Sequence, residues 1–268
     1  MFQTQNFSVG ATQRHAVVGP PHGPPLLLLH GFARQWRTFD PLFPALTAQW
    51  QIHAIDFRGH GRSDRTPDHY RVVHYVEDAQ HYLSTLDEPA VVYGHSLGSM
   101  VAAGVAAAAP DKVRGIVLED PPLQTMGLRI DQTPLLGFFR ELHRFAGDDR
   151  PTGHIARDLA EVRLVNPQTK LQTRLGDVRD RASLRFTAGC LRQLDPEAFP
   201  PIIEGRWLKD FDIDRTFRGI RCPILLMQAD PAAGGMLIDK DVEHLNELCD
   251  DLTHVKLNGV GHLIHWSH

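Results

Sequence analysis

The sequence predicts an α/β protein in which helices cover both faces of a mostly parallel β-sheet. Short apolar runs alternate with helical patterns along most of the chain, which is typical of such folds. Several runs, such as LLLL at residues 26–29, are apolar at every position, as expected for strands buried on both faces. A third observation is that residues 121–221 break this alternation, which indicates a helical insertion.

Seven apolar runs are interpreted as strands, and two segments between them as helices of the core. Over residues 72–86, apolar side chains recur at three- and four-residue steps and form one apolar helical face. Residues 98–109 are rich in alanine and precede Pro110, which indicates a closely packed buried helix. The expected strands are residues 15–18, 26–29, 52–56, 90–93, 116–118, 224–227 and 255–257.

The inserted segment is interpreted as a cap on a core formed by residues 1–120 and 222–268. Within it no strand-like run separates the helical patterns, which cover residues 134–146, 155–165 and 178–194. Open α/β sheets bind ligands at the carboxyl ends of their strands, so we expect the cap to cover that edge. The alternative is a separate helical domain.

Composition and charge exclude several classes of protein. The net charge is −4 and no basic stripe is visible, so nucleic acid is not an expected partner. The first ten residues lack the pattern of a signal peptide, and the apolar stretches are too short to cross a bilayer. Cys190, Cys222 and Cys249 fit no metal spacing and indicate reduced thiols. We therefore expect a cytoplasmic monomer or homodimer without a membrane partner.

Ser96 stands in a strand–turn–helix pattern, AVVYGHSLG at residues 90–98. A serine on such a sharp turn needs glycines on both sides, and Gly94 and Gly98 supply them. The turn would lift the hydroxyl above the sheet and aim the helix N-terminus at developing negative charge. Ser96 is therefore the candidate nucleophile, the alternative being a serine that only caps a helix.

Four ordered motifs make the chain similar to the α/β-hydrolase family over nearly its whole length. Besides the G-x-S-x-G turn, LHGF at residues 29–32 resembles the loop after the third strand of that family, and DFRGHGRSD at 56–64 the turn after its fourth. Gly261-His262 resembles its catalytic-histidine loop. The resemblance implies an eight-stranded sheet with a helical cap and no cofactor.

The resemblance also implies an oxyanion hole built from the backbone N–H groups of Phe32 and Leu97. His30 is expected to fix the loop that carries Phe32 by hydrogen bonding. Arg58 and Asp64 are expected to connect loops rather than to take part in the chemistry, because charged loop residues are usually solvated or paired.

His262 is the candidate base. It follows the apolar run at residues 255–257, lies in the glycine-rich loop NGVGH, and comes after the other candidates in the order serine, acid, histidine. A neutral imidazole there could accept the Ser96 proton and return it to the leaving group. His265 is the alternative base. Because the chain continues for six residues after His262, where the family usually adds a helix, the loop is expected to be poorly held if the sequence is truncated.

Asp230 is the favoured acid of the triad. It follows the apolar run at residues 224–227, where the family usually places this residue. The segment QADP is about two residues shorter than the common arrangement in the family, so the turn must be tighter or the acid displaced. Asp120 and Glu119, after the run at 116–118, are the alternatives, because some family members supply the acid from that strand.

A serine at position 96 favours acyl transfer to water, because family members that displace halide or open epoxides use aspartate there. We expect an esterase-like enzyme acting on an ester, thioester or lactone of a small hydrophobic substrate, with no metal. Amide or carbon–carbon bond hydrolysis, acyltransferase or perhydrolase activity, and a non-catalytic ligand receptor are the alternatives. Phe138, Phe139 and Trp36 are the candidate substrate-binding residues, although the same side chains could pack the cap and helices.

Overall fold

Eight strands form one sheet in the order β1-β2-β4-β3-β5-β6-β9-β10 in the computed structural model, which describes residues 1–165 and 169–267. β1 pairs antiparallel with β2 and β2 antiparallel with β4, whereas the remaining pairs are parallel. The mostly parallel sheet predicted from the sequence is therefore confirmed. The strands are β1 Gln3–Val9, β2 Thr12–Val18, β3 Pro25–Leu29, β4 Gln51–Ile55, β5 Ala90–His95, β6 Val113–Glu119, β9 Ile224–Ala229 and β10 Leu252–Leu257.

The first strand was not expected from the sequence. Of the seven residues of β1, only Phe7 is buried, so the strand lacks the apolar run by which the others are recognised. It lies at the edge of the sheet, where polar side chains are common.

The centre of the sheet is apolar on both faces. All of Leu26–Leu29 is buried, with Leu27 and Leu29 in the large hydrophobic cluster and Leu26 and Leu28 in a second, smaller cluster. Successive side chains of a strand point to opposite faces, so a continuous leucine run fills both clusters. This is the physical reason why the run predicted a central strand.

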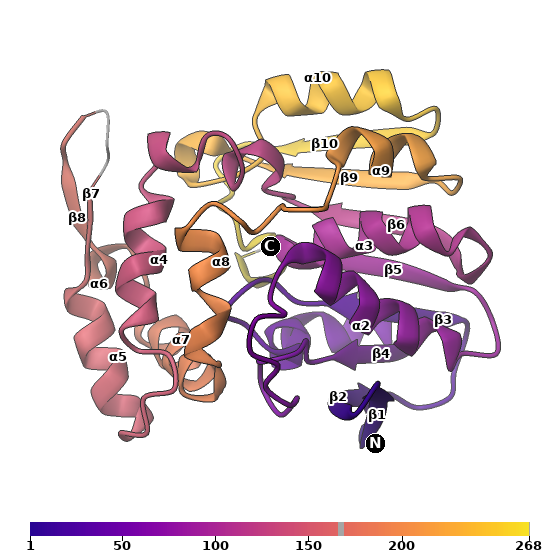
Figure 1. Cartoon of the computed structure of the whole chain (residues 1–268), viewed down its shortest axis with the longest axis horizontal. Coiled ribbons are helices and arrows are strands. Elements are labelled where there is room, and N and C mark those ends of the chain that lie inside the picture. The colour runs from indigo at the N-terminus through magenta and orange to yellow at the C-terminus, as the bar shows by residue number, and fades with distance from the viewer. Residues whose placement is uncertain (166–168, 268) are drawn as a thin grey trace.

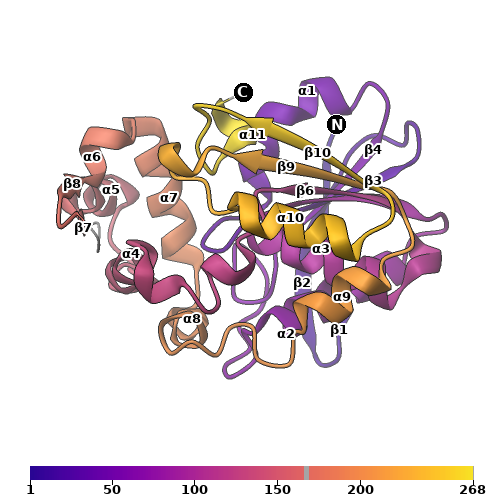
Figure 2. The same ribbon diagram turned by 90° about the horizontal axis from the view of Figure 1, so that it is seen from above.

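Helices lie on both faces of the sheet (Figures 1 and 2). α2, α3, α9 and α10 cover one face, and α1 and α11 lie on the other (Figure 2). From Leu97 to Ala106 every residue of α3 is buried, which confirms the prediction of a closely packed alanine-rich helix. These helices are α1 Phe43–Leu46, α2 Val72–Ser84, α3 Leu97–Ala108, α9 Ile213–Gly219, α10 Asp239–Leu248 and α11 Ile264–Ser267.

The remaining helices, α4 to α8, lie together beside the sheet, to the left in Figure 1. They are α4 Leu135–His143, α5 Thr152–Glu161, α6 Leu175–Val178, α7 Arg181–Gln193 and α8 Pro200–Ile203. We call this group the cap. α9 instead contacts α3, so it belongs to the helices on the sheet although the sequence placed residues up to 221 in the insertion.

A short hairpin in the cap corrects one expectation. β7, Arg163–Val165, pairs antiparallel with β8, Gln172–Arg174, where only helices were expected. The six residues are exposed or half-buried, so the hairpin has no buried apolar run that could identify it. Six short 3-10 helices complete the described structure: η1 Trp36–Leu42, η2 Pro110–Lys112, η3 Leu123–Thr125, η4 Ile130–Gln132, η5 Pro196–Ala198 and η6 Pro231–Ala233.

In the described ranges, no helix has the length and apolar character needed to cross a bilayer.

Candidate active site

Ser96 occupies a strained turn between β5 and α3. Its backbone angles are φ 54° and ψ −114°, a region that residues with a side chain rarely adopt. A Cβ on Gly94 would lie 2.1 Å from the carbonyl oxygen of Gly98, and one on Gly98 would lie 1.9 Å from that of Leu29. Both glycines are therefore needed for the chain to turn back this closely, as the sequence pattern predicts.

Asp120 and His262 form a pair beside this turn. Nδ1 of His262 lies 2.5 Å from Oδ2 of Asp120. The Asp120 carboxylate is buried and also accepts hydrogen bonds from the backbone N–H groups of Met236 at 2.8 Å and Leu237 at 3.1 Å. These donors stabilise a buried anion and fix its direction towards the imidazole.

Asp230, which the sequence favoured as the acid, lies elsewhere. Its carboxylate accepts hydrogen bonds from the backbone N–H groups of Ala232 at 2.9 Å and Gly259 at 2.8 Å, so it connects two loops. These bonds, that from Gly259 first, lower the pKa of Asp230. The structure thus corrects the pairing: Asp120, named from the sequence only as an alternative, contacts His262.

Strand register explains the difference. Glu119 of β6 pairs with Met227 of β9, and the N–H of Asp120 donates to the carbonyl of Met227 at 2.8 Å. Asp120 therefore lies level with the end of β9, on the strand next to β5, whereas Asp230 lies one strand further from Ser96. The turn at residues 228–231, which the sequence showed to be short, keeps Asp230 in the loop after β9.

The serine and the histidine belong to the same site. The backbone N–H of Ser96 donates to the carbonyl of Glu119 at 3.0 Å, which places the serine beside Asp120. The ring of His95 lies 4.6 Å from the ring of His262, and its Nε2 lies 3.0 Å from the His262 carbonyl oxygen. The described residues show no hydrogen bond between the Ser96 hydroxyl and His262. Ser96 is 8% exposed and the His262 side chain 14%, so both reach solvent.

The loop after β3 lies directly against the serine. A Cβ on Gly31 would lie 3.3 Å from Cβ of Ser96. Within the described part of the chain, the backbone N–H groups of Phe32 and Leu97 have no hydrogen-bond partner. Two unpaired donors near a nucleophile are the elements of an oxyanion hole.

His30 holds this loop, as expected. Its Nδ1 lies 2.8 Å from the carbonyl oxygen of Gly31, and its Nε2 accepts a hydrogen bond from the N–H of Phe57 at 3.1 Å. Burial, more than any other cause, lowers the pKa of His30, so the ring is neutral near pH 7.

The alternative base His265 and the alternative acid Glu119 contact each other instead. Nδ1 of His265 lies 2.8 Å from each carboxylate oxygen of Glu119, and its Nε2 lies 3.0 Å from Oγ1 of Thr38. Tyr93 donates a further hydrogen bond to Glu119. Both groups are buried, so this pair anchors α11 and the loop before it.

His95, Glu119 and His265 also form the one described group of side chains whose atoms are close enough to hold a metal ion. Because Glu119 and Nδ1 of His265 bond to each other and Nε2 of His95 bonds to a backbone carbonyl, we assign the group a structural role.

The candidate substrate-binding residues divide into two sets. Phe139 of α4 packs edge-on against Phe32, with ring centroids 5.8 Å apart, and Phe138 lies against Phe139. These side chains connect the cap to the loop beside Ser96. Trp36 instead stacks on Phe43 in the smaller hydrophobic cluster, so its observed contacts are packing contacts.

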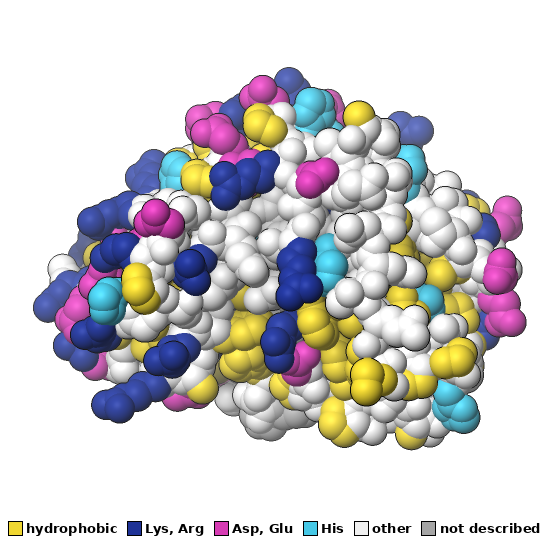
Figure 3. All heavy atoms as spheres, turned by 90° about the horizontal axis from the view of Figure 1, so that it is seen from below, with side chains coloured by type: hydrophobic (Ala, Val, Ile, Leu, Met, Phe, Trp, Pro, Cys, Tyr) yellow, Lys and Arg dark blue, Asp and Glu magenta, His cyan; other side chains and the backbone are white. Residues whose placement is uncertain are grey.

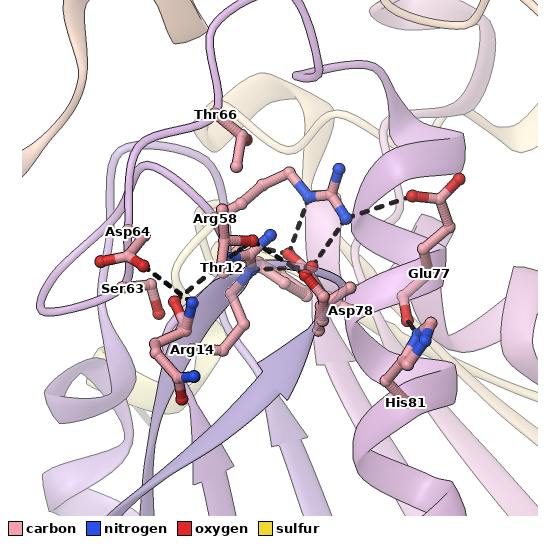
Figure 4. A network of polar contacts seen from close by, with 12 residues as sticks. Thr12, Arg14, Arg58, Ser63, Asp64, Thr66, Glu77, Asp78 and His81 are labelled. Carbon is pink, nitrogen blue, oxygen red and sulfur yellow. Dashed lines mark hydrogen bonds and ion pairs between the residues drawn. The ribbon is translucent and has the colours of Figure 1, made fainter.

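The charged residues of the segment 56–64 connect loops, as predicted (Figure 4). Arg58 forms an ion pair with Asp78 at 2.8 Å, and Arg14 pairs with the same buried carboxylate at 2.8 Å. Asp64 accepts a hydrogen bond from the N–H of Gln13 at 2.8 Å. The network ties β2, α2 and the loop after β4 together away from the serine.

Sequence patterns did not single out Thr38 or Arg34. Arg34 follows Phe32 by two positions, and its guanidinium donates to Oγ1 of Thr187 on α7 at 2.9 Å. The sequence signal that could have identified Arg34 was the position of a charged residue so close to the LHGF motif.

Comparison with known proteins agrees with this arrangement. The family model described as the alpha/beta hydrolase fold matches residues 24–268. A serine hydrolase-like protein of Danio rerio is 41% identical over 110 residues, which cover 40% of this chain and 34% of that protein. A 2-(acetamidomethylene)succinate hydrolase of Mesorhizobium japonicum is 36% identical over 109 residues, covering 40% of this chain and 39% of that protein. The matches thus span well under half the length of these relatives.

A solved structure shares the fold over almost the whole length of both chains. The N-formylmaleamic acid deformylase of Pseudomonas putida S16 superposes with a TM-score of 0.76 at 18% sequence identity, over 99% of this chain and 96% of that one. The family match, the eight-stranded sheet and the serine turn agree, and the chain belongs to the α/β-hydrolase fold family.

Proposed function

We propose that this chain is a serine hydrolase that cleaves a carboxylic ester, thioester or lactone through an acyl-enzyme on Ser96. The observation that carries the proposal is the His262–Asp120 pair at 2.5 Å beside the strained turn of Ser96. An imidazole held by a buried carboxylate is kept in the tautomer whose Nε2 accepts a proton.

The first half-reaction forms the acyl-enzyme. Oγ of Ser96 attacks the carbonyl carbon while Nε2 of His262 takes the hydroxyl proton. Asp120 accepts the Nδ1–H bond and stabilises the imidazolium. The N–H groups of Phe32 and Leu97 would donate to the oxyanion, and His262 returns the proton to the leaving alcohol or thiol.

In the second half-reaction water replaces the leaving group. His262 takes a proton from water, the resulting hydroxide attacks the acyl carbon, and collapse of the intermediate returns the proton to Ser96 and releases the acid. No step needs a cofactor or a metal ion.

Amide hydrolysis is the second candidate function. Two similar proteins are named for 2-(acetamidomethylene)succinate hydrolysis and N-formylmaleamic acid deformylation, and both names denote organic acids. The same triad can cleave an amide: the serine attacks the carbonyl carbon, and the histidine then gives its proton to the leaving nitrogen as the tetrahedral intermediate collapses. Carbon–carbon bond cleavage, acyl transfer or perhydrolysis, and ligand reception without turnover are further alternatives with the same residues.

Phe32, Phe138 and Phe139 support an apolar pocket wall for a small substrate, because they join the cap to the loop beside the serine. We further propose that the protein acts in the cytoplasm, as a monomer or homodimer, on a small molecule without nucleic-acid or membrane partners. Its three cysteines are unpaired thiols.

The proposal is tested with a panel of 4-nitrophenyl esters of increasing acyl length, assayed with wild type and Ser96→Ala. Turnover of at least one ester that disappears in Ser96→Ala supports it, and turnover that survives in Ser96→Ala contradicts it. Adding a competing alcohol and analysing the products separates hydrolysis from acyl transfer. Binding of an activated ester without turnover would favour the alternative that the protein is a non-catalytic ligand receptor.

A further inference from the structure

Arg34 lies one turn beyond the loop that carries the proposed oxyanion donor. Its backbone N–H donates to the carbonyl of Gly31 at 3.2 Å, and a Cβ on Gly31 would lie 3.3 Å from Cβ of Ser96. The ends of such a turn are less than about 7 Å apart, so the Arg34 backbone is close to the nucleophile. Burial, and then the charges of His262, His265 and Arg34, lower the pKa of His95, the residue next to Ser96.

In the part of the chain that the structure describes, the guanidinium of Arg34 contacts two neutral residues of the cap. It donates to Oγ1 of Thr187 at 2.9 Å and lies 5.8 Å from the centre of the Phe186 ring, both on α7. Within residues 1–165 and 169–267 it forms no ion pair, whereas Arg14 and Arg58 each pair with a carboxylate. Arg34 thus spans the junction of core and cap with its charge uncompensated.

Nearby titratable groups do not supply the missing negative charge. Burial, and then the like charge of Arg179, lower the pKa of Arg34 to about 10, so it is still a cation near pH 7. Burial raises the pKa of the Cys190 thiol to about 12, which keeps it neutral. The Asp56 carboxylate is already bonded to the His15 ring at 2.9 Å and to the backbone N–H groups of Trp36 and Arg62.

Arg179 provides a second cation at this junction. Its side chain is exposed, and partial desolvation by the surrounding protein lowers its pKa. An exposed pocket of about 420 Å³ lies next to this junction, and Arg34 and Arg179 are not among its lining residues. The residues that line it include Gln35, Arg37, Asp40, Arg185, Phe186 and Trp266.

The wider charge distribution has the same sign. Residues 150–192 contain nine Lys and Arg against four Asp and Glu. Figure 3 shows Lys and Arg side chains gathered over the cap, on the left of that view. A desolvated cation without a counter-ion is costly to fold, and a positive surface around it attracts anions.

We propose that Arg34, assisted by Arg179, binds a carboxylate of the substrate, so that the preferred substrate is an acyl compound bearing a carboxylate a few bonds from the scissile carbonyl. This inference rests on the proposed serine hydrolase function and names its substrate class. A guanidinium offers two parallel N–H donors that match a carboxylate, and the bound anion would complete the charge balance at the junction.

The test compares monoethyl succinate with ethyl succinamate, its neutral amide counterpart, by release of ethanol. Wild type is expected to favour the carboxylate ester in kcat/KM by about tenfold or more, the change expected for a charge-assisted pair. Arg34→Met should bring the ratio of the two kcat/KM values close to one. Arg34→Lys, which keeps the charge but loses the fork, should retain part of the preference.

Two further variants control for folding and for general charge. Arg179→Met changes an exposed side chain and should lower the ratio without a loss of thermal stability. Arg218→Met, at an exposed arginine of α9 that forms no ion pair in the described ranges, should leave the ratio at the wild-type value. A wild-type ratio near one, or a ratio unchanged in both Arg34→Met and Arg179→Met, would overturn the inference. Failure of the proposed function would instead appear as wild-type ethanol release by Ser96→Ala.

Discussion

Nδ1 of His262 lies 2.5 Å from Oδ2 of Asp120, a residue 142 positions earlier in the chain. Asp120 follows β6, the strand hydrogen-bonded to β5, which leads into Ser96. The pairing therefore brings the proposed acid and base next to the proposed nucleophile at the carboxyl ends of two adjacent parallel strands, where open α/β sheets bind their ligands.

The two aspartates give the first prediction. Asp120→Asn should lower kcat by about 10³–10⁴, because the neutral amide no longer holds the imidazole in the required tautomer. Asp230→Asn should change kcat little, because that carboxylate accepts its hydrogen bonds from the backbone N–H groups of Ala232 and Gly259 and not from His262 in the described ranges. Steady-state kinetics on one ester with both variants decides the point: the reverse order of effects would restore Asp230 as the acid.

Glu119 and Asp120 are adjacent but are expected to respond differently. Glu119→Gln removes the anion that holds His265 and should lower the free energy of unfolding by about 1–3 kcal/mol. Its kcat should stay well above that of Asp120→Asn, because the Glu119 carboxylate bonds to His265, whereas Asp120 bonds to His262. Urea unfolding and kinetics on the same preparations measure both quantities. An equal loss of kcat in Glu119→Gln with unchanged stability would show that Glu119 belongs to the reacting group.

Gly98 tests the geometry of the serine turn, and Gly137 serves as a control outside it. A Cβ on Gly98 would lie 1.9 Å from a backbone oxygen, so Gly98→Ala should destabilise the fold by more than about 4 kcal/mol or prevent folding. A Cβ added to Gly137 in α4 would have no neighbouring atom within 4 Å, so Gly137→Ala should raise the free energy of unfolding by about 0.5–1 kcal/mol. Thermal unfolding of the pair is the measurement, and a tolerated Gly98→Ala would refute the close approach.

Buried histidines predict lower stability in acid. Burial lowers the pKa of His53 to about 4, against 6.5 for the exposed side chain. Between these values the unfolded chain binds a proton that the folded chain does not, so stability present above pH 6.5 is lost as the pH falls towards 4. The contribution of this one group is about 1.4 kcal/mol per pH unit.

Urea unfolding of wild type and His53→Gln at several pH values between 7.5 and 4.5 measures this slope. The variant should depend less steeply on pH over this interval, whatever its stability at pH 7.5. Parallel curves for the two proteins would show that His53 does not contribute to the acid sensitivity. His60, whose pKa burial lowers to about 3, should add to the slope that remains.

Much of the fold was accessible to sequence reasoning because its strands are buried on both faces. The residue composition of the run at 26–29 and of the alanine-rich α3 indicates that both elements are buried. β1 has only Phe7 buried and β7–β8 has no buried residue, so no pattern marks them. Elements at the edge of a structure carry less information in their residue types.

The site shows the same division. Ser96 was predicted because the glycines around it are required by a local backbone shape. The choice between Asp120 and Asp230 depends on how β6 and β9 align, and on loop geometry that residue spacing does not determine. Arg34 was missed because its significance lies in the absence of a counter-charge, which is a property of the folded surroundings.

The central claim is that the Ser96 hydroxyl reacts with the help of His262. The most direct measurement is peptide mass spectrometry after treatment with a serine-directed fluorophosphonate, on wild type, Ser96→Ala and His262→Ala. The account predicts one adduct on the peptide containing Ser96, absent in Ser96→Ala and formed much more slowly in His262→Ala. An adduct on another residue, or equal labelling of Ser96 in His262→Ala, would contradict it.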